Sequence, residues 1–459
     1  MLNCSRVLIK KVIEMIDDIL EFFGLSSPSA KNIKNDILRG GFTRRKVTKL
    51  LRQKDNSVFI GKLKKKKLFI SASDRACVIG PPGTGKTTFM INQIYHWIET
   101  GNNFVCLDIK PEIYDITKAK LKEKGYRCMV YNPTQEAHKY DFIGDLDSLE
   151  SIAEVANSFI YSESNNSVFA ETARDLLNAV ILHIRTPTKK NPDPKPSLSD
   201  VYDFIVEAET MKELLTNLGH SNSDECRAIA RSLSVMADSE RLLGSVFATF
   251  VSNMRFLRLK SIRDSLSADG FSLEYLKKNK VALFLQFEES SQNTLANYFS
   301  VMVGHILRYL IIHHNDRNSV LLLLDEIGNA GVVQGLASKL NTIRSRNMPT
   351  WMYWQSVEQM QKYGNSPGEG ANTILGACDL NMVFRLNDNS SASYFSAKVG
   401  TQDVVKVTVT GNVSTRTMTK ENIIEPHELM NLNEHEVLCS YRGINWLGAA
   451  TPFFQESKK

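Results

Sequence analysis

The segment from Cys77 to Thr88 reads CVIGPPGTGKTT, and its G-x-x-x-x-G-K-T spacing constrains the fold of this chain more than any other feature. This spacing is typical of a loop whose backbone N–H groups surround phosphate oxygens, because glycines adopt backbone angles that other residues avoid. Residues 75–79 predict a short buried strand before the loop. Residues 86–100 have apolar side chains at helical spacing up to Gly101, which predicts a helix after it.

The loop supplies specific partners for a nucleotide. Lys86 is expected to meet the terminal phosphates, and the Thr87 hydroxyl is expected to bind Mg²⁺. A chance match in a glycine-rich surface turn is the alternative, and the flanking strand and helix patterns argue against it. The predicted nucleotide-binding residues are Gly80, Pro81, Pro82, Gly83, Thr84, Gly85, Lys86, Thr87 and Thr88.

A second motif follows the apolar run 320–324, whose continuous hydrophobicity predicts a strand buried on both faces. The next residue, Asp325, is expected to hold Mg²⁺ through water, and Glu326 to orient or deprotonate the attacking water. Two acids that merely end a strand in solvent are the alternative. A further strand, 350–355, ends in Gln355, which is placed to sense the γ-phosphate or position the water.

Strands and helices alternate through much of the chain, which predicts an α/β fold with a mostly parallel sheet covered on both faces. Residues 147–277 have helical periodicity and few strand candidates, so we expect an all-α inserted domain there. The predicted division is a basic N-terminal region at 1–70, a discontinuous nucleotide-binding domain at 71–146 and 278–459, and an all-α domain at 147–277.

Individual elements follow from the same periodicities. Helices are expected at 112–122, 169–184, 201–218, 228–236, 242–257, 293–313 and 332–347, and strands at 104–108, 127–131, 281–286, 381–386 and 436–441. Hairpins are expected from 58–61 with 68–70 and from 404–419. Trp351 and Tyr353 are expected in the core rather than on a base-stacking surface.

The positive charge is concentrated near the N-terminus. Residues 1–70 contain 17 Lys and Arg against 6 Asp and Glu, an excess of 11, whereas the whole chain carries +6, so residues 71–459 carry −5. Clusters at 44–46 and 64–67 suit a phosphate-rich polymer or anionic lipids, with a solvated face as the alternative. Residues 1–25 predict an amphipathic helix that lies on the body of the protein, on a partner or on a membrane surface.

The composition indicates a globular chain with 42% hydrophobic and 23% charged residues. Its seven cysteines include no C-x-x-C pair, which favours a reducing, cytoplasmic compartment. No apolar run approaches the roughly 20 residues that span a bilayer, so neither a transmembrane segment nor a secretory signal is expected.

Several segments, in order, resemble the conjugative coupling-protein family, the VirD4/TraG-type ATPases of type IV secretion. They are the phosphate loop, Asp108-x-Lys110-x-Glu112, residues 169–177, Leu324-Asp325-Glu326-x-x-Asn329, Arg344-Ser345-Arg346-Asn347, Gln355-Ser356, Gln359-x-x-x-Tyr363-Gly364, Pro426-His427-Glu428-Leu429 and Pro452-Phe453-Phe454. The resemblance covers roughly residues 70–455, and 343–364 is its most specific part.

The resemblance implies a RecA-like P-loop domain interrupted by an all-α domain, and a homo-hexamer around a DNA channel, with a monomer in isolation as the alternative. It implies ATP and Mg²⁺ as cofactors, and DNA, a relaxase and secretion-channel ATPases or membrane components as partners. Lys86, Glu326 and Gln355 would serve hydrolysis. Arg344 would be an arginine finger that reaches the neighbouring subunit, with Arg346 as the runner-up.

This sequence departs from the family in two ways. Members usually begin with transmembrane helices, and none is expected here. Attachment to the inner face of the membrane would therefore come from partners, from the N-terminal helix, or not at all. The Pro-Pro-Gly-Thr loop is closer to other ring ATPases. The rival hypotheses are therefore an FtsK/HerA-like pump for duplex DNA and a non-catalytic adaptor that binds ATP only to stabilise a docking platform.

Overall fold

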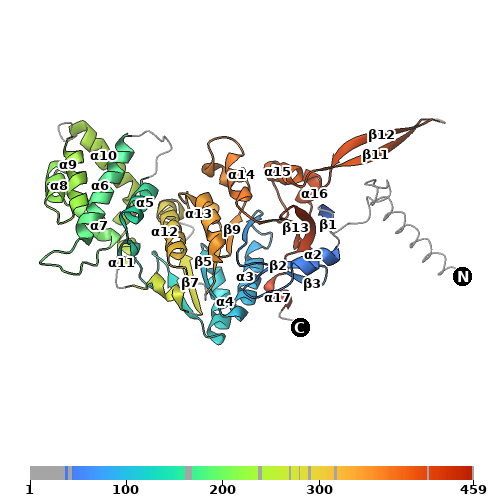
Figure 1. Ribbon diagram of the computed structural model, residues 1–459, viewed down its shortest axis with the longest axis horizontal. Helices are drawn as coiled ribbons and strands as arrows, with labels where there is room; N and C mark the ends of the chain where they lie inside the picture. The colour runs from blue at the N-terminus through green and yellow to red at the C-terminus, as the bar shows by residue number, and fades with distance from the viewer. Residues whose placement is uncertain are drawn as a thin grey trace.

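The computed structural model describes residues 37–39, 44–160, 168–235, 240–267, 270–278, 280–287, 291–314, 318–410 and 413–456. The helix predicted for residues 1–25 lies outside the described residues. Figure 1 shows a sheet with helices packed around it, a group of helices at one end of the molecule, and a two-stranded ribbon that projects from the other end.

Within the described ranges, a twelve-stranded sheet forms the centre of the molecule. Its strands are β1 (Ile37–Arg39), β2 (Val58–Leu63), β3 (Lys66–Ile70), β4 (Arg75–Ile79), β5 (Asn103–Asp108), β6 (Arg127–Tyr131), β7 (Val281–Gln286), β8 (Val320–Leu324), β9 (Thr350–Trp354), β10 (Leu380–Val383), β13 (Glu436–Tyr441) and β14 (Ile444–Ala449). The order is β3-β2-β14-β13-β10-β4-β9-β8-β5-β7-β6, with β1 paired to β14. Neighbours from β10 to β6 run parallel, whereas β13, β14, β2 and β3 pair antiparallel.

Helices cover both faces of this sheet. Outside the segment between β6 and β7 they are α2 (Arg44–Leu50), α3 (Lys86–Trp97), α4 (Glu112–Glu123), α12 (Gln292–Ile312), α13 (Leu336–Ile343), α14 (Glu369–Gly376), α15 (Asn389–Val399), α16 (Pro426–Met430) and α17 (Phe453–Glu456). Because side chains alternate along a strand, Val78 of β4 packs on the same side as Phe89 of α3, whereas Ile79 packs on the same side as α12 and α13. Trp351 and Tyr353 are fully buried, as expected.

The regular elements among the described residues between β6 and β7 are all helices, joined by loops. Its helices are α5 (Leu149–Phe159), α6 (Val168–Arg185), α7 (Leu198–Val206), α8 (Met211–Gly219), α9 (Asp224–Ser234), α10 (Glu240–Asn253) and α11 (Lys260–Ser265). They gather at one end of the molecule, and α5 lies between them and α12 (Figure 1). Asp141 connects the 3₁₀ turn Phe142–Asp145 to the start of α7, because its two carboxylate oxygens accept the backbone N–H groups of Ile143 and Leu198 at 2.8 and 2.7 Å.

Two predicted helices were wrong in extent. The helix expected at 201–218 is two helices, because Thr210 accepts the backbone N–H of Glu213 at 3.1 Å and thereby starts α8 separately. The helix expected at 332–347 is limited to α13 and a following 3₁₀ turn, Arg344–Arg346, since Gly335 has a left-handed backbone at the start of α13. The strand expected at 381–386 is confined to β10.

One helix among the described residues has a length and composition compatible with a membrane span. It comprises Thr294–Ile312 of α12, and 67% of its apolar window is buried inside the fold. There it packs against α5 and α13. Its apolar character is therefore accounted for by the core between the sheet and the helical segment.

Both predicted hairpins are confirmed. β2 and β3 pair antiparallel. β11 (Thr401–Thr410) and β12 (Val413–Asn422) form a separate two-stranded ribbon in which Thr401 faces Asn422. This ribbon projects away from the sheet (Figure 1), and residues 411–412 of the predicted hairpin lie outside the described residues.

Candidate nucleotide-binding site at the carboxyl edge of the sheet

The phosphate-binding motif lies between β4 and α3, as the sequence predicted. Gly83 and Gly85 have φ values of 78° and 95°, which a residue with a Cβ rarely adopts. Gly80 has no room for a side chain, because a Cβ there would lie 2.7 Å from the Cβ of Phe384. The loop is also internally bonded, since Thr84 Oγ1 donates to the carbonyl of Pro81 at 2.8 Å. The glycines are thus required by the shape of the loop.

Lys86 is the first residue of α3, and its side chain turns back into the loop. Its Nζ donates to the carbonyl of Pro81 at 3.0 Å and also to the carbonyl of Gly80. Burial lowers the pKa of Lys86, and the carboxylates of Asp325 and Glu326 act in the opposite direction. The ammonium group therefore lies within the electrostatic reach of both acids, although they are more than 200 residues away in sequence.

The sheet order explains this proximity. β4 and β8 are separated only by β9, and all three strands are parallel, so their carboxyl ends meet at one edge. Asp325 follows β8 directly and is 9% exposed. Its pKa is raised to about 7, chiefly by burial and then by the neighbouring Glu326, while Lys86 lowers it. Burial disfavours the charged form of this carboxyl group, and a bound cation would stabilise that form.

Asp108 is a second buried carboxyl group at this edge. It ends β5 and accepts the backbone N–H groups of Ile113 and Tyr114 at 3.2 and 3.0 Å, and Gln286 Nε2 at 2.8 Å. Burial raises its pKa to about 6, and these three hydrogen bonds oppose the change. Asp108 therefore holds the start of α4 against the sheet, and its charge also raises the pKa of Asp325.

Glu326 and Gln355 end neighbouring strands. Glu326 has a left-handed backbone with φ 44°, uncommon for a residue with a long side chain, and its Oε2 accepts Asn329 Nδ2 at 2.9 Å. Gln355 follows β9 and is half-buried, with its backbone N–H donated to Gln359 Oε1 at 2.9 Å. Both residues lie at the carboxyl edge of the sheet, so the fold brings them to the side on which Lys86 lies.

Arg344 is at the opposite edge. α13 ends beside the start of β4, because Arg75 donates to the carbonyl of Leu340 at 3.0 Å, and Arg344 follows that helix with an exposed side chain. β4 separates this end from the phosphate loop by roughly 16 Å at about 3.3 Å per residue. Arg344 is thus not brought to the site of its own chain.

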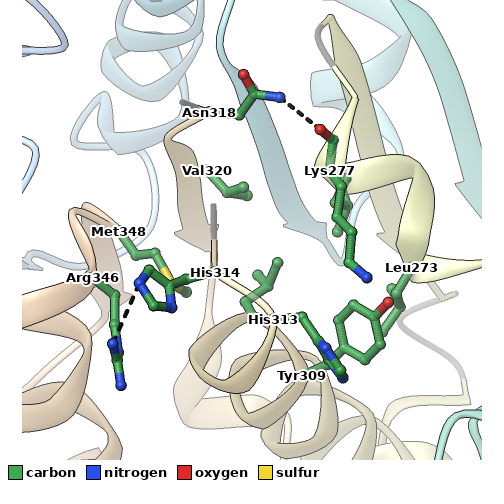
Figure 2. Close-up of a pocket in the computed structure, with 11 residues that line it drawn as sticks. Leu273, Lys277, Tyr309, His313, His314, Asn318, Val320, Arg346 and Met348 are labelled. Atoms are coloured by element: carbon green, nitrogen blue, oxygen red, sulfur yellow. Dashed lines mark hydrogen bonds between the residues drawn. The ribbon is translucent and has the colours of Figure 1, made fainter. Parts of the chain in front are cut away.

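Arg346, the alternative finger, points back into its own chain. Its Nη1 lies 3.3 Å from His314 Nε2. Both side chains line a small cavity, together with Tyr309 and Lys277 (Figure 2). The side chain is half-buried, in contrast to the exposed Arg344. Of the two arginines, Arg344 is the one whose side chain faces outward.

The loop and the acids fit a Mg²⁺-bound nucleotide. The carbonyl oxygens that now accept Lys86 are weak partners for an ammonium group compared with phosphate, and the left-handed glycines leave the backbone open to close approach. In the part of the chain that the structure describes, no group of three or more His, Cys, Asp or Glu side chains could hold a metal ion. Mg²⁺ commonly keeps water and phosphate oxygens as ligands beside one or two protein groups, and Thr87 and Asp325 are the two groups expected from the sequence.

Sequence reasoning gave no chemical role to three residues at this site. Asn329 bonds to Glu326 after β8, and Gln359 bonds to Gln355 after β9. Their spacing of three and four residues from Glu326 and Gln355 is the feature of the sequence that could have indicated these contacts. His435 has a left-handed backbone, and its Nδ1 lies 3.4 Å from where a Cβ of Gly85 would be. No pattern in the sequence placed His435 near the phosphate loop.

Comparisons with known proteins identify the fold. The bacterial conjugative coupling protein TrwBdeltaN70 in an unbound monoclinic form is 15% identical with a TM-score of 0.66, and the match covers 91% of this chain and 95% of that one. Plasmid coupling protein TrwB in complex with the non-hydrolysable ATP analogue ADPNP is 16% identical with a TM-score of 0.68, covering 90% and 93%. VirB4 of Thermoanaerobacter pseudethanolicus is 12% identical with a TM-score of 0.52, covering 88% and 99%. No curated protein sequence matches the chain.

These likenesses confirm the predicted fold class, a RecA-like P-loop NTPase domain with a mostly parallel sheet and an inserted helical segment. The sequence itself is matched by the model of a family described as type IV secretory system conjugative DNA transfer. That match extends over residues 31–445, which is most of the chain. The protein therefore belongs to the type IV secretory system conjugative DNA transfer family, as its motifs predicted.

Proposed function

We propose that this protein hydrolyses ATP and uses the free energy to move DNA towards a type IV secretion or conjugation channel. The observation that carries the proposal is the position of the Lys86 loop and the Asp325–Glu326 pair at one edge of a parallel sheet, with a single strand between them. An adaptor that only binds ATP has no use for a glutamate beside the phosphates. Membership in a DNA-transfer family supports DNA as the cargo.

Each residue then has a distinct role in hydrolysis. The backbone of 80–88 holds the phosphates, and Lys86 moves from the Gly80 and Pro81 carbonyls to the terminal phosphates. Mg²⁺, held by Thr87 and by Asp325 through water, would neutralise charge on the phosphate oxygens. Glu326 orients and deprotonates the attacking water, while Gln355 contacts the γ-phosphate.

The proposed active form is a homo-hexamer, in which Arg344 of one subunit completes the site of the next. The exposed position of Arg344, at the sheet edge away from its own phosphate loop, supports a role between subunits. The proposed partners are a relaxase bound to the DNA and the ATPases or membrane components of the channel. They would hold the protein at the inner face of the membrane.

The direct test is ATP turnover of the purified protein with and without single-stranded or duplex DNA. We expect DNA to stimulate turnover, and we expect the stimulation to decline as salt rises from about 50 to 200 mM, because backbone contacts release counterions. The Lys86→Ala variant, which lacks the phosphate-binding ammonium group, is the control and should remain inactive with either DNA.

The outcomes separate the rival functions. Turnover that no DNA changes at any salt concentration would contradict the DNA motor. Tight ATP binding with undetectable turnover would favour the non-catalytic adaptor. Stimulation by duplex DNA alone, without co-purification of a relaxase, would favour an FtsK/HerA-like duplex pump.

A further inference from the structure

A chain of hydrogen bonds connects the carboxylate of Glu326 to the backbone of Gln355. Asn329 Nδ2 donates to Glu326 Oε2 at 2.9 Å, and Gln359 Nε2 donates to Asn329 Oδ1 at 3.3 Å. Gln359 Oε1 accepts the backbone N–H of Gln355 at 2.9 Å. The chain thus joins the end of β8 to the end of β9, two strands that are hydrogen-bonded neighbours.

The chemistry at its two ends determines the orientation of both amides. An ionised carboxylate only accepts, so Asn329 must turn its amino group to Glu326 and its oxygen to Gln359. A backbone N–H only donates, so Gln359 must turn its oxygen to Gln355 and its amino group to Asn329. Turning either amide over would break two hydrogen bonds. A displacement at one end is therefore transmitted rather than absorbed by a local flip.

Packing holds the two loops together around this chain. Gly328 has no space for a side chain, because a Cβ would lie 2.4 Å from Gln359 Oε1. Lys362 Nζ donates to the carbonyls of Gly328 and Gly331, both at 2.7 Å, and thereby joins the segment Glu358–Tyr363 to the loop after β8. A shift of one loop relative to the other would break these contacts.

We propose that Asn329 and Gln359 are positioning residues for hydrolysis, which together hold the Glu326 carboxylate in the orientation set by Gln355. The inference rests on the proposed function, in which Glu326 activates water and Gln355 contacts the γ-phosphate. When a γ-phosphate contacts Gln355 at the end of β9, the two amides transmit the resulting displacement to Glu326, which acts on water. Neither Asn329 nor Gln359 needs to touch the nucleotide.

The sharpest test is Gln359→Glu, because glutamate has nearly the same size and keeps an oxygen for the N–H of Gln355. It replaces the donor that faces Asn329 Oδ1 with an acceptor, so the chain is interrupted at one bond while the packing on Gly328 is retained. We expect kcat to fall about 10- to 100-fold, because a misplaced catalytic group costs about that much. KM for ATP, binding of a fluorescent ATP analogue and Tm should change little.

Asn329→Ala should lower kcat to a similar extent, and the double variant with Gln359→Glu should be no worse than either single variant, because both interrupt one chain. Gln361→Ala is the matched control. Gln361 lies in the same 3₁₀ segment, but its amide bonds to the backbone of Ser366 and Gly368, so this variant should keep the original kcat.

The proposal would be overturned by an unchanged kcat in Gln359→Glu, by additive losses in the double variant, or by a loss of nucleotide affinity that accounts for the loss of rate. An increase in kcat would overturn it as well, since the chain would then restrain Glu326. A failure of the proposed function is read separately, from the unsubstituted protein. Absence of ATP turnover there would reject the positioning role as well. Turnover that DNA does not change would contradict only the DNA motor, and the kcat of Gln359→Glu would still test the positioning role.

Discussion

Replacing Glu326 with glutamine should reduce ATP turnover by about 10²- to 10⁴-fold while Mg²⁺-ATP binding persists. Glutamine has the shape of glutamate but cannot take a proton from water. The phosphate loop, with Lys86 and the backbone of 80–88, remains intact and supplies the affinity. Phosphate release measures kcat, and titration with a fluorescent ATP analogue measures Kd.

Two variants make this result specific. Glu358→Gln removes an exposed carboxylate a few residues after β9 and should leave kcat unchanged. Lys86→Ala should instead lose nucleotide binding itself. If Glu326→Gln retained normal turnover, Glu326 would not be the group that activates water.

Replacing Arg344 with alanine should lower turnover by about 10³- to 10⁵-fold, the range typical of an arginine finger, without weakening nucleotide binding. The reason is geometric: Arg344 is exposed at the sheet edge opposite its own phosphate loop, so the nucleotide that it would contact in the proposed hexamer is that of a neighbouring subunit. Arg346→Ala should cost much less, because that guanidinium group faces His314 of its own chain.

Mixing two inactive variants tests the action between subunits. An Arg344→Ala subunit has an intact phosphate loop, and a Lys86→Ala subunit has an intact Arg344. Where the second lies beside the first in a ring, a complete site forms, so mixtures should recover part of the turnover. Absence of recovery, together with weakened nucleotide binding in Arg344→Ala, would instead indicate a structural role for Arg344.

The motifs of the candidate site could be recognised in the sequence because each depends on a local pattern. The glycine spacing of the phosphate loop requires particular backbone angles, and the apolar run of β8 requires burial on both faces, so each motif carries its own structural signal. The order of the strands has no such signal. That β9 lies between β4 and β8 depends on its pairing with β4, from which it is separated by more than 200 residues, as well as on its pairing with β8.

Smaller features were missed for different physical reasons. β14 pairs antiparallel with β13 next to a tight turn at Gly443, and its sequence lacks the continuous apolar run that marked the central strands. The break before α8 was visible as a capping signal at Thr210, but helical periodicity continues across it. The amide chain through Asn329 and Gln359 joins two loops, and only the folded sheet brings those loops together.

A structure of the Glu326→Gln variant with ATP, Mg²⁺ and DNA, determined by electron cryo-microscopy, tests the central claim most directly. We predict the triphosphate on residues 80–88, with the metal between Thr87 and Asp325 of the same chain and Arg344 of an adjacent subunit at the γ-phosphate. A nucleotide bound elsewhere, or a metal that faces away from Asp325, would contradict the account.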